Sequence, residues 1–390
     1  MTVLRPKSDT LMDNNASAEI FTRAMLRASE KGEVSAAAIS KAGAPDTTRF
    51  AKFCAPSTQH TIHVLDANRA APLIREMNVT KQTVDNWRAS GRVNWFIYDL
   101  DKTISGAELV RDVRKRAIDE GKLAEASRGP LEEAMRLCEI PVIKGEPLFD
   151  AHRRFARLRP QFEKTLSPKE KLEHNRALFP TLSRFFAGMH QDELAAITDQ
   201  VIADTISPHV YEGIVETAEA LAEKNITPFI VSASTDFLVK RLAKFFREKT
   251  GTTAFEEQNA LGMPLDLNAS GYFENRLAEG KAPTYDDGKA KAVQLEAKTR
   301  YGIDDAKVVG SAADKPFSTD RALFGPELDP LIRFIVRPAS EEEFKVMVYW
   351  AEKLDLPCVV LDPKQYVSGR ETKPIDYASL LAGFGAAMHR

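Results

Sequence analysis

The sequence predicts an α/β protein built around a parallel sheet. Five short apolar runs, rich in β-branched and aromatic residues, are separated by longer segments with apolar residues at helical spacing. The runs contain few polar positions, as strands do when helices cover both faces of a sheet. The chain has 390 residues, of which 43% are hydrophobic and 28% are charged. This length is enough for two or three domains with sizeable cores.

Composition excludes several classes of protein. The 54 basic and 56 acidic side chains leave a net charge of −2, which excludes a polybasic coat protein and an acidic disordered tail. The three cysteines lie far apart, so neither a disulfide framework nor a thiolate zinc site is expected, and a reducing compartment fits. The first ten residues lack the apolar segment of a secretory signal, and no apolar run reaches about 18 residues. We therefore expect a cytoplasmic protein without a membrane partner.

The predicted elements follow one another in a regular order. Residues 1–91 are predicted to form helical pieces, including two short helices around Asn78. The first strand, Val93–Tyr98, precedes a long helical stretch at about 107–223 that prolines divide into several helices. The later elements are a strand at Ile226–Val231, a helix at Asp236–Lys249, a hairpin at Leu265–Phe273, a helix at Gly288–Tyr301, strands at Ala306–Gly310 and Ile332–Val336, a helix at Ser340–Leu354 and a strand at Pro357–Leu361.

Two carboxylates follow the first strand directly, in the pattern Asp99-x-Asp101-x-Thr103. Because the working groups of a parallel sheet sit at the carboxyl ends of its strands, both carboxylates can face one crevice. One can attack as a nucleophile while its neighbour donates a proton to the leaving group. Their mutual repulsion requires a cation, and Mg²⁺ is the expected one.

Polar groups also follow two later strands. Ser232 and Ala233 come after the second strand, where a hydroxyl and backbone N–H groups at a strand-to-helix turn can cradle phosphate oxygens. Asp314 comes after the third strand, with Asp320 a little later, and an acidic group there would complete a site of oxygen ligands for a hard cation.

A lysine at the start of a predicted helix completes the set. Lys289 could neutralise the charge of a carboxylate nucleophile and a phosphoryl group in the transition state. Lys291 is the competing assignment, and the spacing of the apolar residues behind Lys289 favours Lys289.

The order of these motifs resembles the haloacid dehalogenase-like phosphohydrolase superfamily, and within it the phosphoserine-phosphatase-like branch. The resemblance covers about residues 93–365 and includes the segments IVSASTDFLVKRLA, NASGYFENR and LIRFIVRPASEEEF. It implies a Rossmann-like core made of residues 92–103 and 224–390, with a helical cap at 104–223 inserted just after the first motif. Residues 1–91 would then form a separate N-terminal helical region.

The same resemblance implies Mg²⁺-dependent hydrolysis of a small phosphomonoester through an aspartyl-phosphate. Asp99 would be the nucleophile, and Asp101 would be the general acid and then the base for the hydrolytic water. Asp99, the backbone carbonyl of Asp101 and the acid of the last motif, Asp314 or Asp320, would hold the metal. The phosphoryl group and the substrate would lie against Thr103, Glu108, Ser232, Ala233 and Lys289.

The last motif departs from the family pattern, because Ser311 follows Gly310 where an aspartate is expected. Either Asp314 replaces a later acid of the motif, or the loop is one residue shorter, or Asp320 reaches in. The alternative function is therefore a catalytically degenerate member that regulates, or that binds DNA or a protein through the helix-turn-helix-like segment Leu73–Trp87. Residues 1–90 carry only a small excess of basic groups, which is thin for phosphate-driven binding, so nucleic acid is not the expected partner. No oligomeric state is predicted.

Overall fold

A sheet of parallel strands forms the centre of the fold. The computed structural model describes residues 62–251, 254–316, 319–336 and 358–362. Within them, seven strands lie in the order β1-β9-β8-β7-β2-β3-β4, and every neighbouring pair is parallel. The strands are β1 (Ile62–Asp66), β2 (Arg92–Tyr98), β3 (Thr227–Thr235), β4 (Ala260–Met263), β7 (Lys307–Ala313), β8 (Ile332–Val336) and β9 (Cys358–Asp362). The predicted α/β class with a parallel, Rossmann-like sheet is confirmed.

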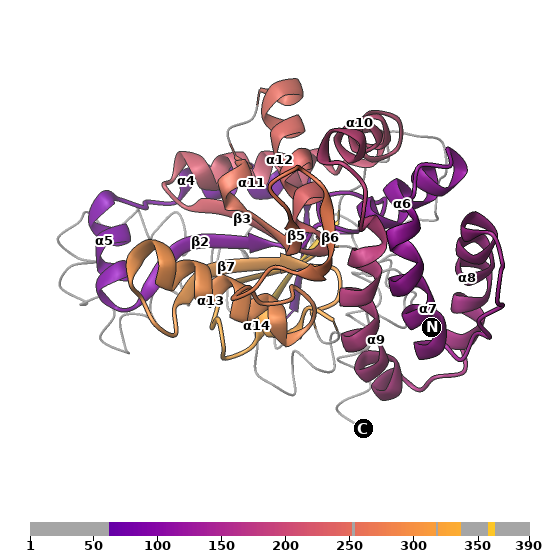
Figure 1. The fold of residues 1–390 in the computed structure, drawn as a ribbon. Coiled ribbons are helices and arrows are strands. Elements are labelled where there is room, and N and C mark those ends of the chain that lie inside the picture. Colours follow the sequence, from indigo (N-terminus) through magenta and orange to yellow (C-terminus); the bar gives the residue numbers. More distant parts are fainter. Residues whose placement is uncertain (1–61, 252–253, 317–318, 337–357, 363–390) are drawn as a thin grey trace, which may run out of the picture.

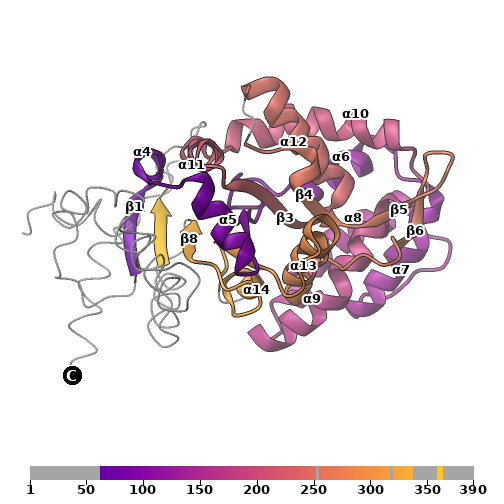
Figure 2. The ribbon, with the colours of Figure 1, turned by 90° about the vertical axis from the view of Figure 1, so that its left-hand side faces the viewer.

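Helices cover both faces of this sheet (Figures 1 and 2). Trp95 and Ile97 of β2 pack in one apolar cluster with α13 (Asp287–Tyr301) and α14 (Arg321–Phe324). Phe96 and Tyr98, which alternate with them along the strand, pack in a second cluster on the other face. That face is covered by the helices α4 (Ala67–Glu76), α11 (Glu212–Glu223) and α12 (Asp236–Thr250). All seven residues of β2 are buried, which explains why five of them are apolar or aromatic and none alternates with an exposed polar position.

Residues 104–211, which lie between the Asp99–Thr103 motif and α11, form the cap segment. Figure 1 shows its helices beyond the end of the sheet at which β2 finishes. They are α6 (Leu109–Asp119), α7 (Arg128–Leu137), α8 (Leu148–Glu163), α9 (Pro168–Ser183) and α10 (Gln191–Val201). The predicted hairpin is present as β5 (Leu265–Leu267) and β6 (Phe273–Leu277), and Phe273 exchanges backbone hydrogen bonds with Gly188 and Met189 of the cap segment. No helix in the described ranges is both long and apolar enough to cross a bilayer.

The structure differs from the predicted domain boundaries at two places. β1 lies in the region predicted to be only helical, and it pairs with β9 at the edge of the sheet. α11, assigned by the sequence to the cap, packs instead against α4 and β3. β1 was missed because IHVLD is short and contains a histidine, and β4 because ALGM contains a glycine. The predicted helix Ser340–Leu354 and the predicted helices before residue 62 lie outside the described residues.

The helix-turn-helix-like segment forms the two helices that the sequence predicts around Asn78. α4 packs against α11, and α5 (Lys81–Ala89) packs against β2 with Val84 and Trp87 buried. Thr80 caps α5 by accepting a hydrogen bond from the backbone N–H of Thr83. Both helices therefore bury their apolar residues against the α/β core, and none of these contacts favours the DNA-binding alternative.

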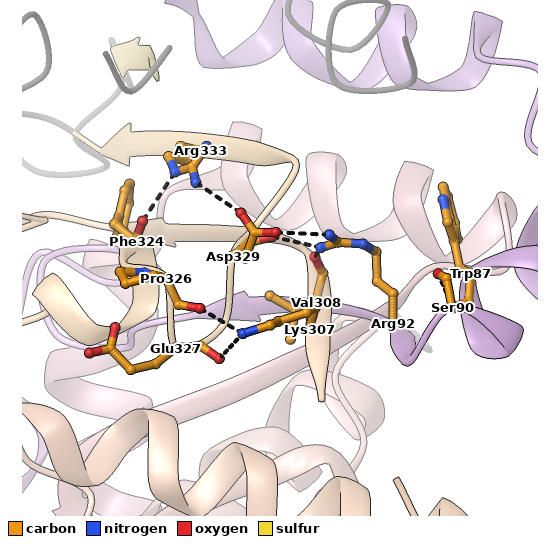
Figure 3. Close-up of polar contacts among 10 residues, drawn as sticks. All are labelled: Trp87, Ser90, Arg92, Lys307, Val308, Phe324, Pro326, Glu327, Asp329 and Arg333. Atoms are coloured by element: carbon orange, nitrogen blue, oxygen red, sulfur yellow. Dashed lines mark hydrogen bonds and ion pairs between the residues drawn. The ribbon is translucent and has the colours of Figure 1, made fainter. Parts of the chain in front are cut away.

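A buried arginine joins the amino ends of β2, β7 and β8 (Figure 3). The predicted site lies at the opposite, carboxyl ends of the strands. Arg92, the first residue of β2, is 1% exposed. Its Nη1 donates to the carbonyl oxygens of Val308 (2.5 Å) and Asp329 (2.6 Å), and its Nη2 lies 3.2 Å from Asp329 Oδ2. β7 and the segment that leads into β8 are thereby tied to β2.

Replacing Arg92 with methionine is expected to lower the free energy of unfolding by about 2–4 kcal/mol, because a buried donor to two carbonyls and one ion pair is lost. Lys307→Met is the matched control. The Lys307 ammonium also donates to two carbonyls in Figure 3, those of Pro326 and Glu327, but it does so at the exposed surface. Its loss is expected to cost less than about 1 kcal/mol. Urea unfolding midpoints measure both, and equal shifts would contradict the structural role of Arg92.

Candidate active site

The predicted site lies at the point where the chain changes direction across the sheet. From β2 the chain passes to β3 and β4 on one side, and later returns to β7 and β8 on the other. A crevice opens at the carboxyl ends of the strands at such a point. Asp99 follows β2 at this position, and its backbone N–H donates to the carbonyl of Ala312 on β7 at 2.9 Å. The fold thus fixes the backbone of Asp99 between β3 and β7.

Lys289 contacts two carboxylates in this crevice. Its Nζ lies 2.5 Å from Asp99 Oδ1 and 2.5 Å from Asp320 Oδ1, and all three side chains are buried. Lys289 stands in the first turn of α13, whereas Lys291, the competing assignment, is exposed. Burial would lower the pKa of the Lys289 ammonium, but the charges of Asp320 and Asp99 outweigh it and raise that pKa. Lys289 is therefore a fixed positive charge.

A third carboxylate completes a compact acidic cluster. One oxygen each of Asp99, Asp314 and Asp320 lies within 4.8 Å of the others, and all three residues are buried. Three ionised carboxylates and one ammonium would leave an excess of negative charge. The pKa of Asp314 is raised, mainly because its carboxyl group is buried and secondly because Asp320 repels its charged form. Oxygen ligands at this spacing fit a hard divalent cation such as Mg²⁺. Both acids that the sequence left open, Asp314 and Asp320, are in the cluster.

Ser311, which stands where an aspartate was expected, is not part of this acidic cluster. It lies within β7, paired in register with Ile97 of β2 and Arg333 of β8, and its hydroxyl is buried. The acids of the last motif come from the loop beyond the strand instead. Their position after the strand end lets them turn back toward Asp99.

Asp101 is not one of the three clustered carboxylates, and its side chain has other partners. Its Oδ1 accepts a hydrogen bond from the backbone N–H of Leu109 at 2.9 Å, and its Oδ2 accepts one from the Ser234 hydroxyl at 3.2 Å. Leu109 begins α6, so the positive end of that helix faces the carboxyl group. Both carboxylate oxygens of Asp101 are thus held by hydrogen bonds, and its roles in metal binding through the backbone carbonyl and in proton transfer stay predictions.

Burial shifts the acidity of both carboxyl groups of the first motif. It raises the pKa of Asp99 to about 6, although Lys289 lowers this pKa and Asp320 raises it further. Burial also raises the pKa of Asp101 to about 7, with the charge of Asp99 as the next cause. A carboxyl group with a pKa near 7 can hold a proton at neutral pH and release it during a reaction.

Of the two other predicted residues in this part of the chain, Thr103 contacts Asp99 and Glu108 contacts two basic side chains. The Thr103 hydroxyl donates to Asp99 Oδ2 at 3.4 Å. Glu108, the residue before α6, lies 3.2 Å from Lys102 Nζ and 3.1 Å from Arg111 Nη1. Burial would raise the pKa of Glu108, but Arg111 and Lys102 outweigh it and lower that pKa. Glu108 is therefore a partly exposed anion between two cations.

The serine motif is shifted relative to its predicted position. β3 runs on to Thr235, so Ser232 and Ala233 lie inside the strand and not after it. The Ser232 hydroxyl accepts a hydrogen bond from the backbone N–H of Ser234 at 3.0 Å, and Ser234 is the residue whose side chain reaches Asp101. Ser234 was missed because a Ser-Ala-Ser-Thr segment fits a strand and a turn equally well. Phosphate binding by Ser232 and Ala233 stays a prediction.

Comparisons with known proteins give likenesses in structure but none in sequence family. No protein-family model matches the chain, and no curated protein matches it. The chain is similar to a protein of unknown function from Bordetella pertussis Tohama I, with 15% identity, 69% of this chain and 98% of that chain covered, and a TM-score of 0.46.

Two further solved structures carry descriptive names. One is a phosphoserine phosphohydrolase-like protein from Francisella tularensis subsp. tularensis SCHU S4, with 15% identity, 65% and 91% of the two chains covered, and a TM-score of 0.36. The other is a probable phosphoserine phosphatase from Vibrio cholerae, with 12% identity, 69% and 68% covered, and a TM-score of 0.34. At these identities and TM-scores the likenesses carry no functional conclusion.

Proposed function

We propose that this protein hydrolyses a phosphomonoester through a covalent phosphoryl intermediate on Asp99. The observation that carries the proposal is the buried cluster at the end of β2. There the Asp99 carboxylate is 2.5 Å from the Lys289 ammonium and within 4.8 Å of two further carboxylates. A carboxylate fixed at a strand end beside a permanent positive charge is arranged to attack an anionic, electrophilic centre. The order of the motifs, which resembles haloacid dehalogenase-like phosphohydrolases, supports the same reaction.

Asp99 would act as the nucleophile. One of its oxygens is held by Lys289 and the other accepts from Thr103, so its orientation is fixed before a substrate binds. Attack by a carboxylate oxygen forms an O–P bond while the bond from phosphorus to the substrate alcohol breaks. The product of this step is an acyl-phosphate on Asp99. In the transition state, the oxygens of the transferred phosphoryl group carry negative charge. Lys289 would neutralise part of that charge.

Asp101 would move the protons. Its raised pKa, about 7, supports a carboxyl group that protonates the leaving alkoxide oxygen. The resulting carboxylate would then take a proton from the water that attacks phosphorus and frees Asp99. Leu109 and Ser234 hold Asp101 by one oxygen each, so its position does not depend on the substrate.

The acidic cluster would hold the divalent cation. Asp99, Asp314 and Asp320 supply carboxylate oxygens, and the backbone carbonyl of Asp101 is the further ligand that the family resemblance implies. When bound, Mg²⁺ would offset the excess negative charge of the site and of the phosphoryl group. A small phosphorylated metabolite is the proposed substrate class, with Glu108 near the leaving group; a cytoplasmic location stays a prediction.

A phosphate-release screen with and without Mg²⁺ tests this function. We expect release from at least one phosphomonoester in millimolar Mg²⁺ and none after chelation. In Asp314→Asn, the Mg²⁺ concentration that gives half the maximal rate should rise at least about tenfold, because a charged oxygen ligand is lost.

The matched control is Asp304→Asn, which removes an exposed carboxylate that pairs only with the exposed Lys298 in the described ion pairs. This variant should keep the parent's Mg²⁺ requirement. Release that survives chelation, or equal Mg²⁺ requirements in the parent and Asp314→Asn, would contradict the metal site.

A further inference from the structure

Asp286 occupies a backbone conformation that normally belongs to glycine. Its φ is +50° and its ψ is −124°, and the backbone N–H of Gly288 donates to the carbonyl of Tyr285 at 3.0 Å. These are the features of a type II′ turn with Asp286 as its first central residue, where glycine is preferred. The side chain is also completely buried. An aspartate at such a position needs a reason beyond forming the turn.

Two arginines from different parts of the molecule contact this carboxylate. Arg176 of α9, in the cap segment, places Nε 2.7 Å from Asp286 Oδ2. Arg321 of α14, in the core, places Nε 3.0 Å from Asp286 Oδ1. The same two guanidinium groups also reach the neighbouring Asp287, at 3.2 and 3.0 Å. One buried carboxylate therefore ties the cap segment to the core.

The turn that holds Asp286 also holds Lys289. The backbone N–H of Lys289 donates to the carbonyl of Asp286 at 3.0 Å. The turn is closely packed at Gly288, where an added Cβ would lie 1.8 Å from the carbonyl oxygen of Pro283, so a larger residue does not fit. Asp286 is thus the residue directly before α13, and its carbonyl contacts the residue whose ammonium meets Asp99.

We infer that Arg176 and Asp286 are positioning residues. Through them, the placement of Lys289 depends on the contact between the cap segment and the core. With the cap segment seated, Arg176 and Arg321 hold Asp286 from two sides, and Lys289 is directed at Asp99. Without Arg176, the turn is held from the core side only, and the ammonium is less well placed. This inference rests on the proposed function, because it gives the cap segment a part in that reaction. Neither residue touches the reacting atoms.

The first test compares two ion pairs between the cap segment and the core. Arg176→Gln is expected to lower kcat roughly ten- to hundredfold, with KM changed by less than about threefold, because a small misplacement of a catalytic group is costly. Arg176→Lys should recover only part of the rate, since it restores the charge but not the second N–H. The control is Arg241→Gln, which removes an ion pair between α12 and Asp199 of α10, distant in the chain from the Lys289 turn. Equal losses of kcat in Arg176→Gln and Arg241→Gln would overturn the inference.

A second variant separates the carboxylate from the turn. Asp286→Gly keeps the turn, because glycine prefers its φ, but it leaves Arg176 and Arg321 without the buried carboxylate. Its thermal midpoint should therefore fall, while the protein stays folded at the assay temperature. If Asp286 served only the turn, kcat would stay at the parent value. We expect kcat to fall as in Arg176→Gln, and the double variant to lose little more, because the two residues act as one unit.

Amide hydrogen exchange gives a measurement that does not need activity. Exchange in the segment 283–292 should be faster in Arg176→Gln than in the parent, and unchanged in Arg241→Gln. Unchanged exchange in Arg176→Gln would overturn the coupling even if the protein is a phosphatase. Faster exchange in a protein that releases no phosphate would leave the coupling standing while the proposed function fails.

Discussion

Asp99→Asn is expected to abolish phosphate release, with a loss in kcat on the order of 10³-fold or more. An amide is not a competent nucleophile toward phosphorus, so no acyl-phosphate can form at this position. The substitution preserves the size of a buried side chain, so the fold should survive. Release of p-nitrophenol from p-nitrophenyl phosphate in Mg²⁺, or turnover of the substrate found by screening, measures the effect.

The covalent step can be followed separately. The protein is mixed with a substrate that carries the radiolabel in its phosphoryl group and is then quenched in acid. The parent should retain label, and Asp99→Asn should retain none. Circular dichroism with a thermal scan should show that both proteins are folded. Activity within tenfold of the parent, or label retained by the variant, would remove Asp99 as the nucleophile.

Lys289→Met should cause the second largest loss, on the order of 10²–10³-fold in kcat, because the charge that faces both Asp99 and the phosphoryl group disappears. The pH dependence should change as well. Lys289 lowers the pKa of Asp99, which stands at about 6 in its presence. Without Lys289 this pKa rises, so Asp99 is protonated over a wider range. The loss of activity on the acid side should therefore begin at a higher pH.

Lys291→Met is the control for that variant. Lys291 lies on the same helix two residues away, but it is exposed. Its replacement should leave both kcat and the pH profile at the parent values. If the two variants behave alike, the effect belongs to the helix and not to the ammonium in the crevice.

Much of the fold could be predicted because buried parallel strands have a strong sequence pattern. Four strands, β2, β7, β8 and β9, both begin and end within three residues of their predicted limits. Each is a mostly apolar run bounded by polar residues. β1 and β4 could not be predicted in this way. They are the two edges of the sheet, where a strand has one neighbour and needs fewer apolar residues.

The parts of the candidate site that could be predicted are the residues that come directly after a strand. Asp99 and Asp101 follow β2 within three residues, so the sequence could place them at the end of that strand, and their catalytic roles stay predictions. Asp320 follows a loop whose path cannot be predicted from a sequence pattern. From the sequence, Asp320 was therefore only an alternative to Asp314. The contact between Arg176 and Asp286 joins residues that are more than a hundred positions apart, and no local signal marks either partner. Long-range ion pairs of this kind require coordinates.

The pairing of β1 with β9 has a consequence for how the chain is made. β1 is the first described strand to leave the ribosome, yet the strand beside it in the finished sheet is the last. Until β9 is synthesised, the backbone groups of β1 and of the outer side of β8 have no partner strand within the described sheet. A nascent or C-terminally shortened chain therefore exposes two open strand edges, and chaperone binding to ribosome-bound chains should be strongest just before β9 emerges.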